Sequence, residues 1–559
     1  MRSVVSLFAL GLVGFIGCAA SGDSAGYLDN GGGAANPGSS SGGDGGTGAP
    51  GSIGNGNGNG GGGNVDAGGN GNPGTNPTPG TDSGTPGNPG TPGTDGGTTV
   101  PPAANGFLAD GLSITEVAVF QAVKVDVMKA GAQVTTRVAP VVANRTAFVR
   151  VYVAPGAGWS PHAITAELRL SGTATVFKST LTPGGASTDD VLGSTFNFDV
   201  PDTSLPKGVT YSVALTDPAK TSGVTSGTAA RYPQSGEEDI LAKSSGDQLK
   251  VVLVPVQYNA DGSGRLPPTD ATMVEKYRKA MYAYYPAAKV DMTVRAPYAW
   301  SQTISSSGTG FSTILQAIVK LRASDGVPSD VYYFGAFTPA SSFSAYCNPS
   351  CVAGLSGVGT SPSDSGVRAS VGIGFSDSDS GTTMAHEVGH AHGVQHAPCG
   401  GAASPDPSFP YSGGFDGSWG YDPSTKKLIS PTVGHDLMGY CSNVWISDYN
   451  YNKFFTRMAY VNNAPAMANA FASPRPYRFV SVGVDGSATW GDSLTLAQQP
   501  FGEAHQVEFQ TAAGQTTTVT GAYYAYDHLP GGYMLVPEPP AGATNVRITG
   551  PSVQQTITR

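Results

Sequence analysis

Three histidines and a glutamate stand close together in the stretch HEVGHAHGVQH, which runs from residue 386 to residue 396. His386 and His390 are four residues apart, so on a helix their side chains project from the same face. Two imidazoles placed in this way can occupy two corners of a zinc tetrahedron. Gly393 permits the backbone to turn sharply out of the helix, which brings His396 back as a third nitrogen ligand. The spacing therefore predicts a Zn2+ site whose fourth position is open to water.

A carboxylate lies beside these histidines and suits the chemistry of hydrolysis. Glu387 adjoins His386 on the helix, so it can reach a metal-bound water without itself binding the metal. Zinc lowers the pKa of such a water towards neutrality and can polarise a substrate carbonyl. Glu387 is then expected to act as general base during attack and to pass the proton to the leaving amine. A chance match to the whole pattern is rare in a chain with 8 histidines.

The motif HExxHxxGxxH, together with a methionine further along the chain, resembles the metzincin clan of zinc endopeptidases. The methionine is Met438, which stands in the sequence DLMGY, 42 residues after His396. In this clan a methionine in a tight turn lies beneath the zinc, so the resemblance implies that Met438 forms an apolar floor under the ligands. A methionine in a turn next to a glycine could equally be part of the core.

Tyr440 follows Met438 by two residues, a spacing found in the astacin-like and serralysin-like branches of the clan. The resemblance implies that its phenol contacts the zinc or stabilises the oxyanion, since a donor near the carbonyl oxygen stabilises developing charge. The alternative is a buried tyrosine that serves only in packing. Residues 247–460 carry the resemblance, and both mucin-cleaving and pappalysin-like bacterial metzincins are similar, without one branch being favoured.

Other polar residues near the motif have simpler interpretations. His392 lies on the opposite side of the helix from His390 and is predicted to be structural or exposed. For His435 a surface position is favoured over a place in the substrate cleft. Asp377 and Asp379 resemble half of a calcium loop, but the rest of that pattern is missing, so a turn and a helix cap are favoured.

The cysteines indicate two disulfides. Apart from Cys18, four cysteines are present, and an even number outside the cytoplasm favours paired thiols. Of three possible pairings we favour Cys347 with Cys351, which can close a tight loop, and Cys399 with Cys441, which each follow a part of the predicted metal site. A four-cysteine zinc site is the alternative, but a paired CxxC is lacking. Because only Cys18 precedes Cys347, the thiolate latch that some metzincins place in a propeptide is not available.

The first 18 residues have the features of a bacterial signal peptide. Arg2 supplies a positive charge, and residues 4–16 form an uncharged apolar stretch that is too short to span a bilayer comfortably. The sequence FIGCA resembles the lipobox of bacterial lipoproteins, in which the cysteine, here Cys18, is lipidated, although Phe15 replaces the usual leucine. A simple secretory signal is the alternative. The protein is expected outside the cytoplasm, as an outer-membrane or cell-surface lipoprotein or as a secreted protein.

Residues 19–105 are a low-complexity tract of Gly, Asn, Pro, Ser and Thr without Lys or Arg. Such a tract has almost nothing apolar to bury, so it is predicted to be a disordered tether between a lipid anchor and the folded body.

Three folded regions are predicted to follow and to position the motif. Residues 106–240 contain short alternating runs separated by turns, which predict an antiparallel β-sandwich. Residues 245–472 alternate strands and helices, which predicts an α/β metzincin-like catalytic domain with a largely parallel sheet. Residues 473–559 return to short strands and predict a small C-terminal β domain. In the central region we expect strands at 249–256, near 289–296, at 331–334 and at 367–375, and helices at 269–285 and near 311–322.

The charge of the chain excludes one class of partner. The formal net charge is −10 and no Lys/Arg-rich run is present, which argues against nucleic acid. The predicted function is hydrolysis of peptide bonds in extracellular proteins or glycoproteins, with membrane attachment only through a lipid anchor. The alternatives are a surface-anchored adhesion or binding protein with an inactive metalloprotease-like domain, and a zinc hydrolase that acts on other substrates. The presence of all three ligands and of Glu387 weighs against the adhesion protein.

Overall fold

The computed structural model describes residues 106–246, 248–464, 470–549 and 554–558. All of them belong to one compact unit. Within it the chain is multidomain in organisation and mainly β-sheet, with few helices. The predicted signal segment with Cys18 and the predicted tether lie outside the described residues. Across the described part of the chain, no helix is both long and apolar enough to cross a membrane.

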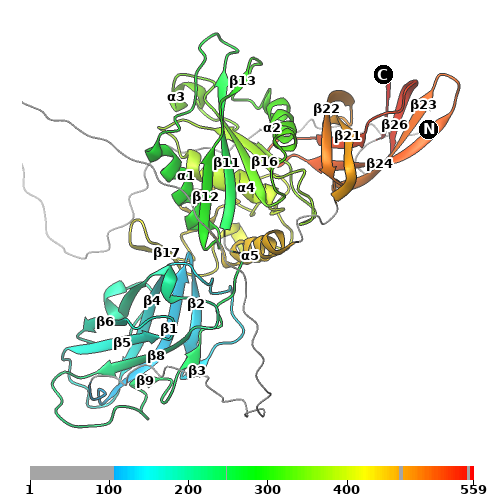
Figure 1. Ribbon diagram of the computed structural model, residues 1–559. Helices are drawn as coiled ribbons and strands as arrows, with labels where there is room; N and C mark the ends of the chain where they lie inside the picture. Colours follow the sequence, from blue (N-terminus) through cyan, green and yellow to red (C-terminus); the bar gives the residue numbers. More distant parts are fainter. Residues whose placement is uncertain (1–105, 247, 465–469, 550–553, 559) are drawn as a thin grey trace, which may run out of the picture. The chain divides into compact units, whose positions relative to one another are not determined.

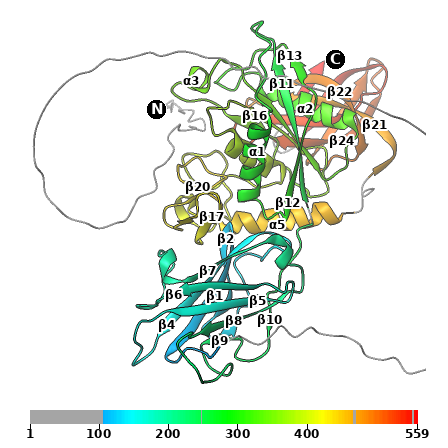
Figure 2. The ribbon, with the colours of Figure 1, turned by 60° about the vertical axis from the view of Figure 1, so that its left-hand side comes forward.

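The N-terminal region forms two antiparallel sheets around an apolar core. Its strands are β1 (Leu112–Gln121), β2 (Val123–Lys129), β3 (Ala132–Gln133), β4 (Ala147–Pro155), β5 (Ile164–Leu170), β6 (Val176–Leu181), β7 (Phe196–Val200), β8 (Thr210–Thr216), β9 (Arg231–Tyr232) and β10 (Glu238–Asp239). One layer contains β2-β1-β4-β7 and the other β10-β8-β5-β6 (Figure 2). Val117 and Val119 of β1 lie in the core between the two layers, whereas Ala118 and Phe120 lie on the opposite face of β1 and are buried in a second cluster with Tyr421.

The central region is built on a six-stranded sheet. Its strands are β11 (Gln248–Tyr258), β12 (Lys289–Val294), β13 (Tyr298–Trp300), β14 (Val331–Phe337), β15 (Gly354–Ser356) and β16 (Ala369–Ile373). Their order is β12-β11-β14-β16-β15, with β13 also paired to β11, and all neighbours are parallel except β15, which runs antiparallel to β16. The strand expected near 289–296 ends at Val294, and β13 follows separately because Pro297 has no amide hydrogen to donate.

Helices cover both faces of this sheet. They are α1 (Ala271–Tyr284), α2 (Phe311–Asp325), α3 (Phe343–Tyr346), α4 (Ser380–Ala391) and α5 (Asp448–Asn463). The side chain of Asp270 caps α1 by accepting from the amides of residues 272 and 273. Met281 of α1 and Met384 of α4 pack in one core with one face of the sheet, whereas Ile314 and Ile318 of α2 pack against the other (Figure 1).

A long segment with little regular structure connects α4 to α5, and part of it joins the N-terminal sheet. It contains η3 (Ser412–Gly414), β17 (Gly420–Asp422), β18 (Lys427–Ile429), β19 (His435–Asp436) and β20 (Val444–Trp445). Gly420 of β17 pairs with Val123 of β2, so β17 and β18 extend the first N-terminal layer. Tyr421 N and Trp445 Nε1 both donate to Ala122 O at 3.0 Å. We call residues 392–447 the floor segment.

The C-terminal region is a seven-stranded antiparallel sheet. Its strands are β21 (Ala470–Val482), β22 (Ala488–Gln498), β23 (Glu503–Thr511), β24 (Thr516–Ala525), β25 (Gly532–Pro537), β26 (Ala543–Thr549) and β27 (Gln554–Thr558), in the order β22-β21-β25-β24-β23-β26-β27. Phe479, Tyr524 and Leu535 share one apolar core with Ile314 of α2. This sheet is therefore packed on the central region through a continuous core.

Candidate metal centre

Helix α4 carries the predicted motif and ends within it. Gly393 follows the helix with φ at +83°, and a Cβ there would lie 2.1 Å from Gly359 O, so a larger residue does not fit. The chain turns back at this glycine. As a result the ring centroid of His396 lies 5.5 Å from that of His386 and 4.5 Å from that of His390.

The three rings are oriented by backbone carbonyls. Nδ1 of His386 lies 2.7 Å from Leu437 O, Nδ1 of His390 lies 2.8 Å from Val394 O, and Nδ1 of His396 lies 2.6 Å from Ala403 O. A carbonyl can only accept, so each neutral ring carries its proton on Nδ1 and keeps a lone pair on Nε2. The Nε2 atoms of His386 and His390 are 3.0 Å apart. Two lone pairs at this distance repel each other, and a cation between them removes the repulsion.

Burial keeps these rings neutral. The three residues are at most 5 % exposed. Desolvation, followed by the charges of neighbouring histidines, lowers the pKa of His386 and His390 well below its usual value. The same causes lower the pKa of His396 to about 3. Neutral imidazole is the form that binds a metal ion.

Glu387 lies beside the histidines, against the edge strand β15. A Cβ on Gly354 would lie 2.3 Å from Glu387 Oε1, so the strand approaches the carboxylate as closely as only glycine allows. The Glu387 side chain is 2 % exposed, and its Oε2 lacks a hydrogen-bond partner among the described residues. Burial raises the pKa of Glu387 to about 8. A carboxyl group in this state can take up and release a proton near neutral pH.

Met438 lies under α4, where its sulfur would be 2.7 Å from a Cβ on Gly389. It is fully buried. The turn around it is held by Asp436, whose carboxylate accepts hydrogen bonds from Met438 N at 2.8 Å, Asn450 Nδ2 at 2.8 Å and Ser447 N at 2.9 Å. The same turn supplies the carbonyl of Leu437 that orients His386. The role of Asp436 is not evident from the sequence, because nothing in its local pattern separates it from a turn residue.

Tyr440 lies at the donor cluster. Its hydroxyl is 3.0 Å from His396 Nε2 and also hydrogen-bonds to His528 Nδ1. Its ring centroid is 6.1 Å from that of His386. The phenol therefore lies beside two of the three predicted ligands, His386 and His396.

Two further residues of the cluster come from the C-terminal region. Donor atoms of Asp527 and His528 lie within 4.8 Å of those of His386, His390 and His396. The sequence pattern of this region predicts no chemistry. The available signal was a pair of ligand-type residues directly before Leu-Pro-Gly-Gly, in a chain with 8 histidines.

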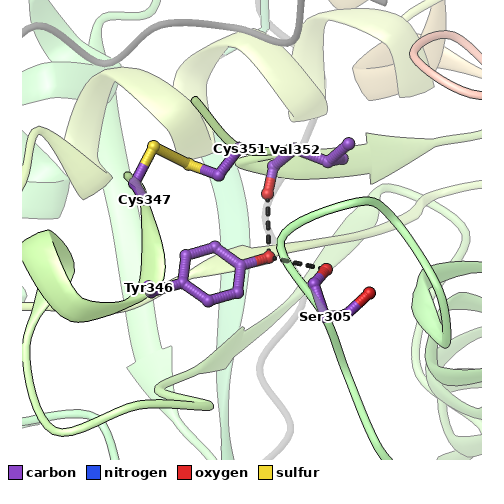
Figure 3. The surroundings of a disulfide bond; sticks show 5 residues. All are labelled: Ser305, Tyr346, Cys347, Cys351 and Val352. Atoms are coloured by element: carbon purple, nitrogen blue, oxygen red, sulfur yellow. Dashed lines mark hydrogen bonds between the residues drawn. A yellow bond between two sulfur atoms is a disulfide. The ribbon is translucent and has the colours of Figure 1, made fainter. Parts of the chain in front are cut away.

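The structure contains the two disulfides favoured from the sequence, Cys347–Cys351 and Cys399–Cys441. The second lies near His435, but its paired sulfurs are not available as ligands. The first closes a loop ahead of β15. Tyr346 fixes this loop because its hydroxyl bonds to Val352 O at 3.0 Å and to Ser305 O at 3.1 Å (Figure 3).

The other polar residues near the motif have structural surroundings. His392 is buried, stacks on Tyr332 with ring centroids 4.3 Å apart, and holds Val388 O through Nδ1 at 2.9 Å. His435 is half-buried and stacks on Phe415. Asp379 caps α4 and Asp377 lies exposed in the preceding turn.

One protein-family model matches part of this chain. A family model described as Peptidase M66 matches residues 287–457, which include the three predicted ligands, Glu387 and Met438. Among solved structures, metalloproteinase-II from Bacteroides fragilis is similar at 12 % identity and a TM-score of 0.23, over 56 % of this chain and 79 % of that chain. A comparison with curated proteins gives no match. The Peptidase M66 match and a His/Asp cluster able to hold a metal ion support a metallopeptidase, and a peptidase domain implies a protein substrate.

Proposed function

We propose that this protein is a zinc-dependent endopeptidase with a metzincin arrangement of its central region, which hydrolyses peptide bonds of extracellular proteins or glycoproteins. One observation carries the proposal. Three neutral imidazoles, each fixed through Nδ1 to a backbone carbonyl, direct their Nε2 lone pairs to one place beside a buried glutamate.

The donor set favours zinc over other common metals. Calcium and magnesium prefer oxygen ligands, whereas three imidazole nitrogens are typical of catalytic zinc. The short separation of the His386 and His390 Nε2 atoms, 3.0 Å, fits two ligands that share one cation. When bound, zinc supplies Lewis acidity that activates water and polarises a carbonyl.

The chain's own residues move the proton and stabilise charge. Glu387 takes a proton from the attacking water and passes it to the leaving amine, which its buried position and its pKa of about 8 allow. Tyr440 is placed to donate a hydrogen bond to the carbonyl oxygen as negative charge develops there. Met438 and Asp436 keep the ligands in place from below.

The location of the protein belongs to the same proposal. Lipidation of Cys18 anchors the chain to a membrane surface from outside the cytoplasm, and residues 19–105 tether the folded body to that anchor. This placement gives the peptidase access to extracellular proteins and glycoproteins, and it needs no membrane-spanning helix.

The Glu387→Gln variant tests the proposal. Gln keeps the shape and can still hydrogen-bond, but it cannot accept the proton, so we expect a loss of about 10²–10⁴-fold in peptidase activity with zinc retained. Zinc content and hydrolysis of casein and mucin are measured for both proteins. Equal activity in the two proteins would place the hydrolysis elsewhere.

His386→Ala completes the test because it should lose zinc. A parent protein that retains about one zinc per chain but cleaves only non-peptide substrates would favour the other zinc hydrolases. A parent protein that binds zinc but hydrolyses nothing would favour an adhesion protein if its zinc position is also accessible to solvent. A closed site would give the same lack of hydrolysis in an enzyme.

A further inference from the structure

The turn between β24 and β25, residues 526–531, reaches the metal centre. Asp527 Oδ2 lies 3.3 Å from His390 Nε2, and the Asp527 side chain is fully buried. Nε2 of His390 carries no proton, because its Nδ1 donates to Val394 O. Asp527 Oδ2 also lies 3.2 Å from His528 Nε2, and its carboxyl group faces that of Glu387. A carboxylate oxygen and a lone pair at this distance repel each other unless a proton or a metal ion lies between them, and a metal ion held by the three histidines would meet Asp527 as well.

The neighbouring residue, His528, contacts Glu387, the proposed general base. His528 Nε2 donates to Glu387 Oε1 at 2.9 Å, and its Nδ1 accepts from the Tyr440 hydroxyl. Its side chain is 6 % exposed. His528 thus contacts both residues that the proposed reaction uses for proton transfer and charge stabilisation.

The backbone of this turn also pairs with the edge strand of the central sheet. Ser356 N of β15 donates to Asp527 Oδ1 at 2.9 Å, and Asp527 N donates to Ser356 O at 3.3 Å. Two residues later along the central chain, Val358 N donates to Ala525 O at 3.1 Å. An edge strand is the place where an extended peptide can add to a sheet. Here the chain's own turn takes that place, next to Glu387.

Apolar contacts hold the turn in position. Leu529 packs on Gly308, where a Cβ would lie 2.6 Å from its Cδ2 and 3.3 Å from Val352 Cγ2. Val352 belongs to the segment that the Tyr346 hydroxyl fixes (Figure 3). Close to the turn, in β24, the Tyr524 hydroxyl donates to the buried carboxylate of Asp364.

We propose that Asp527 is a fourth zinc ligand and that residues 526–531 hold the enzyme in a closed, latent state, which opens when the turn leaves β15. The inference rests on the proposed zinc peptidase function. Three histidines and a carboxylate form the closed, four-ligand set of a structural zinc site, whereas a catalytic site keeps one position for water. In the closed state Asp527 fills the ligand position that water would occupy. His528 hydrogen-bonds to Glu387, and the turn pairs with the edge strand β15.

The test uses the full-length zinc-loaded chain and the Asp527→Asn variant. Asn retains the shape and can accept from Ser356 N, but it lacks the charge that makes Asp527 a ligand. Three measurements are made: the rate of zinc release to EDTA, the affinity for acetohydroxamate as a probe of the open zinc position, and casein hydrolysis. Because a closed state reduces apparent affinity by the fraction that is open, we expect each quantity to rise by about 10- to 100-fold in the variant.

Two further variants guard the interpretation. Asp485→Asn, in an exposed turn of the same sheet, is the matched control and should behave as wild type. Leu529→Asp leaves the ligand in the sequence but removes the apolar anchor, so it should shift all three measurements in the same direction as Asp527→Asn.

Specific results would overturn the proposal that residues 526–531 hold the enzyme closed. Equal zinc release and equal acetohydroxamate affinity in wild type and Asp527→Asn would exclude Asp527 as a ligand. Lower casein hydrolysis in Asp527→Asn and Leu529→Asp would mean that the turn completes the active site instead of closing it. Failure of the proposed function is recognised separately, because then the wild type binds no zinc or His386→Ala retains it.

Discussion

The two β regions that flank the centre look alike in sequence, with short strands, frequent turns and no obvious chemistry, yet they contact the central region in different ways. The N-terminal region contacts the end of α1 and the floor segment. The C-terminal region packs on α2 and sends one turn to the metal donors. Among the described residues, the donor cluster contains none from the N-terminal region.

The N-terminal region contacts the end of α1, which in turn contacts the ligand-bearing helix α4. Arg145 donates to Tyr285 O at 2.9 Å, Ala287 O at 2.7 Å and Tyr282 O at 2.5 Å. Tyr282 O needs this partner, because the residue four positions later is Pro286, which has no amide hydrogen. The Tyr285 hydroxyl in turn donates to Ala385 O, directly before His386 in α4. The comparison predicts that changes in the N-terminal region alter folding stability, whereas changes in the C-terminal turn alter access to the metal.

The largest effect is expected for Arg145→Met. The variant keeps an apolar stem but leaves buried carbonyls without donors, so the free energy of unfolding should fall by about 3 kcal/mol. Zinc release to EDTA from the folded protein should not change. Urea unfolding and zinc release are measured in parallel, with the exposed Arg475→Met of the C-terminal sheet as control, which should stay within about 0.5 kcal/mol of wild type. Faster zinc release at unchanged stability would contradict the division between the two regions.

A second, smaller effect concerns pH and the floor segment. Asp416 is fully buried and both its carboxylate oxygens lack hydrogen-bond partners among the described residues. Desolvation, with repulsion from Asp436 and Asp448, raises its pKa from 3.8 to about 9. The folded state therefore binds one more proton than the unfolded state between these values, so stability should fall as pH rises through this window.

The Asp416→Asn variant tests that dependence. Asn cannot ionise, so the melting temperature should decline less between pH 5 and pH 9 in the variant than in wild type. Asp485→Asn is a suitable control, because its carboxylate is exposed and has a lowered pKa, which keeps it ionised throughout this range. Parallel pH profiles for wild type and Asp416→Asn would show that another group sets the dependence.

The parts of the site that the sequence predicts are local. His386 and His390 share a face because of helical geometry, and Gly393 must turn because only glycine tolerates its conformation and the nearby carbonyl of Gly359. The two disulfides follow equally from the number of cysteines and their short spacings. These features depend on a few neighbouring residues, and a single sequence contains that information.

The missed parts depend on which distant segments dock. His528 lies 132 residues after His396 in the chain, and nothing in the period of β24 or β25 says that their turn pairs with β15. Asp436 reads as an ordinary turn residue until Asn450 and Ser447 are brought to it. Alternation of apolar and polar residues predicts a strand and its buried face, but it does not predict which segment pairs with an edge strand.

The smallest expected effect is on the free energy of unfolding, and it comes from the same substitution, tryptophan to phenylalanine, made at two positions of the chain. Trp445 Nε1 donates to Ala122 O at 3.0 Å and so ties the floor segment to the N-terminal sheet. Trp490, in β22 of the C-terminal sheet, has a buried Nε1 without a hydrogen-bond partner among the described residues. Replacing each tryptophan by phenylalanine removes the same N–H group. Trp445→Phe should lower the free energy of unfolding by about 0.5–1 kcal/mol, near the low end because Ala122 O keeps its bond from Tyr421 N.

Trp490→Phe should lose less than Trp445→Phe in the same urea unfolding experiment, since it removes a donor that made no bond. The remaining loss reports only the smaller ring, which both variants share. Zinc release should match wild type in both proteins, because neither tryptophan belongs to the donor cluster or to the turn at residues 526–531. A larger loss for Trp490→Phe would show that the bond to Ala122 O does not stabilise the contact between the floor segment and the N-terminal sheet. The stabilising role assigned to the N-terminal region would then rest on Arg145 alone.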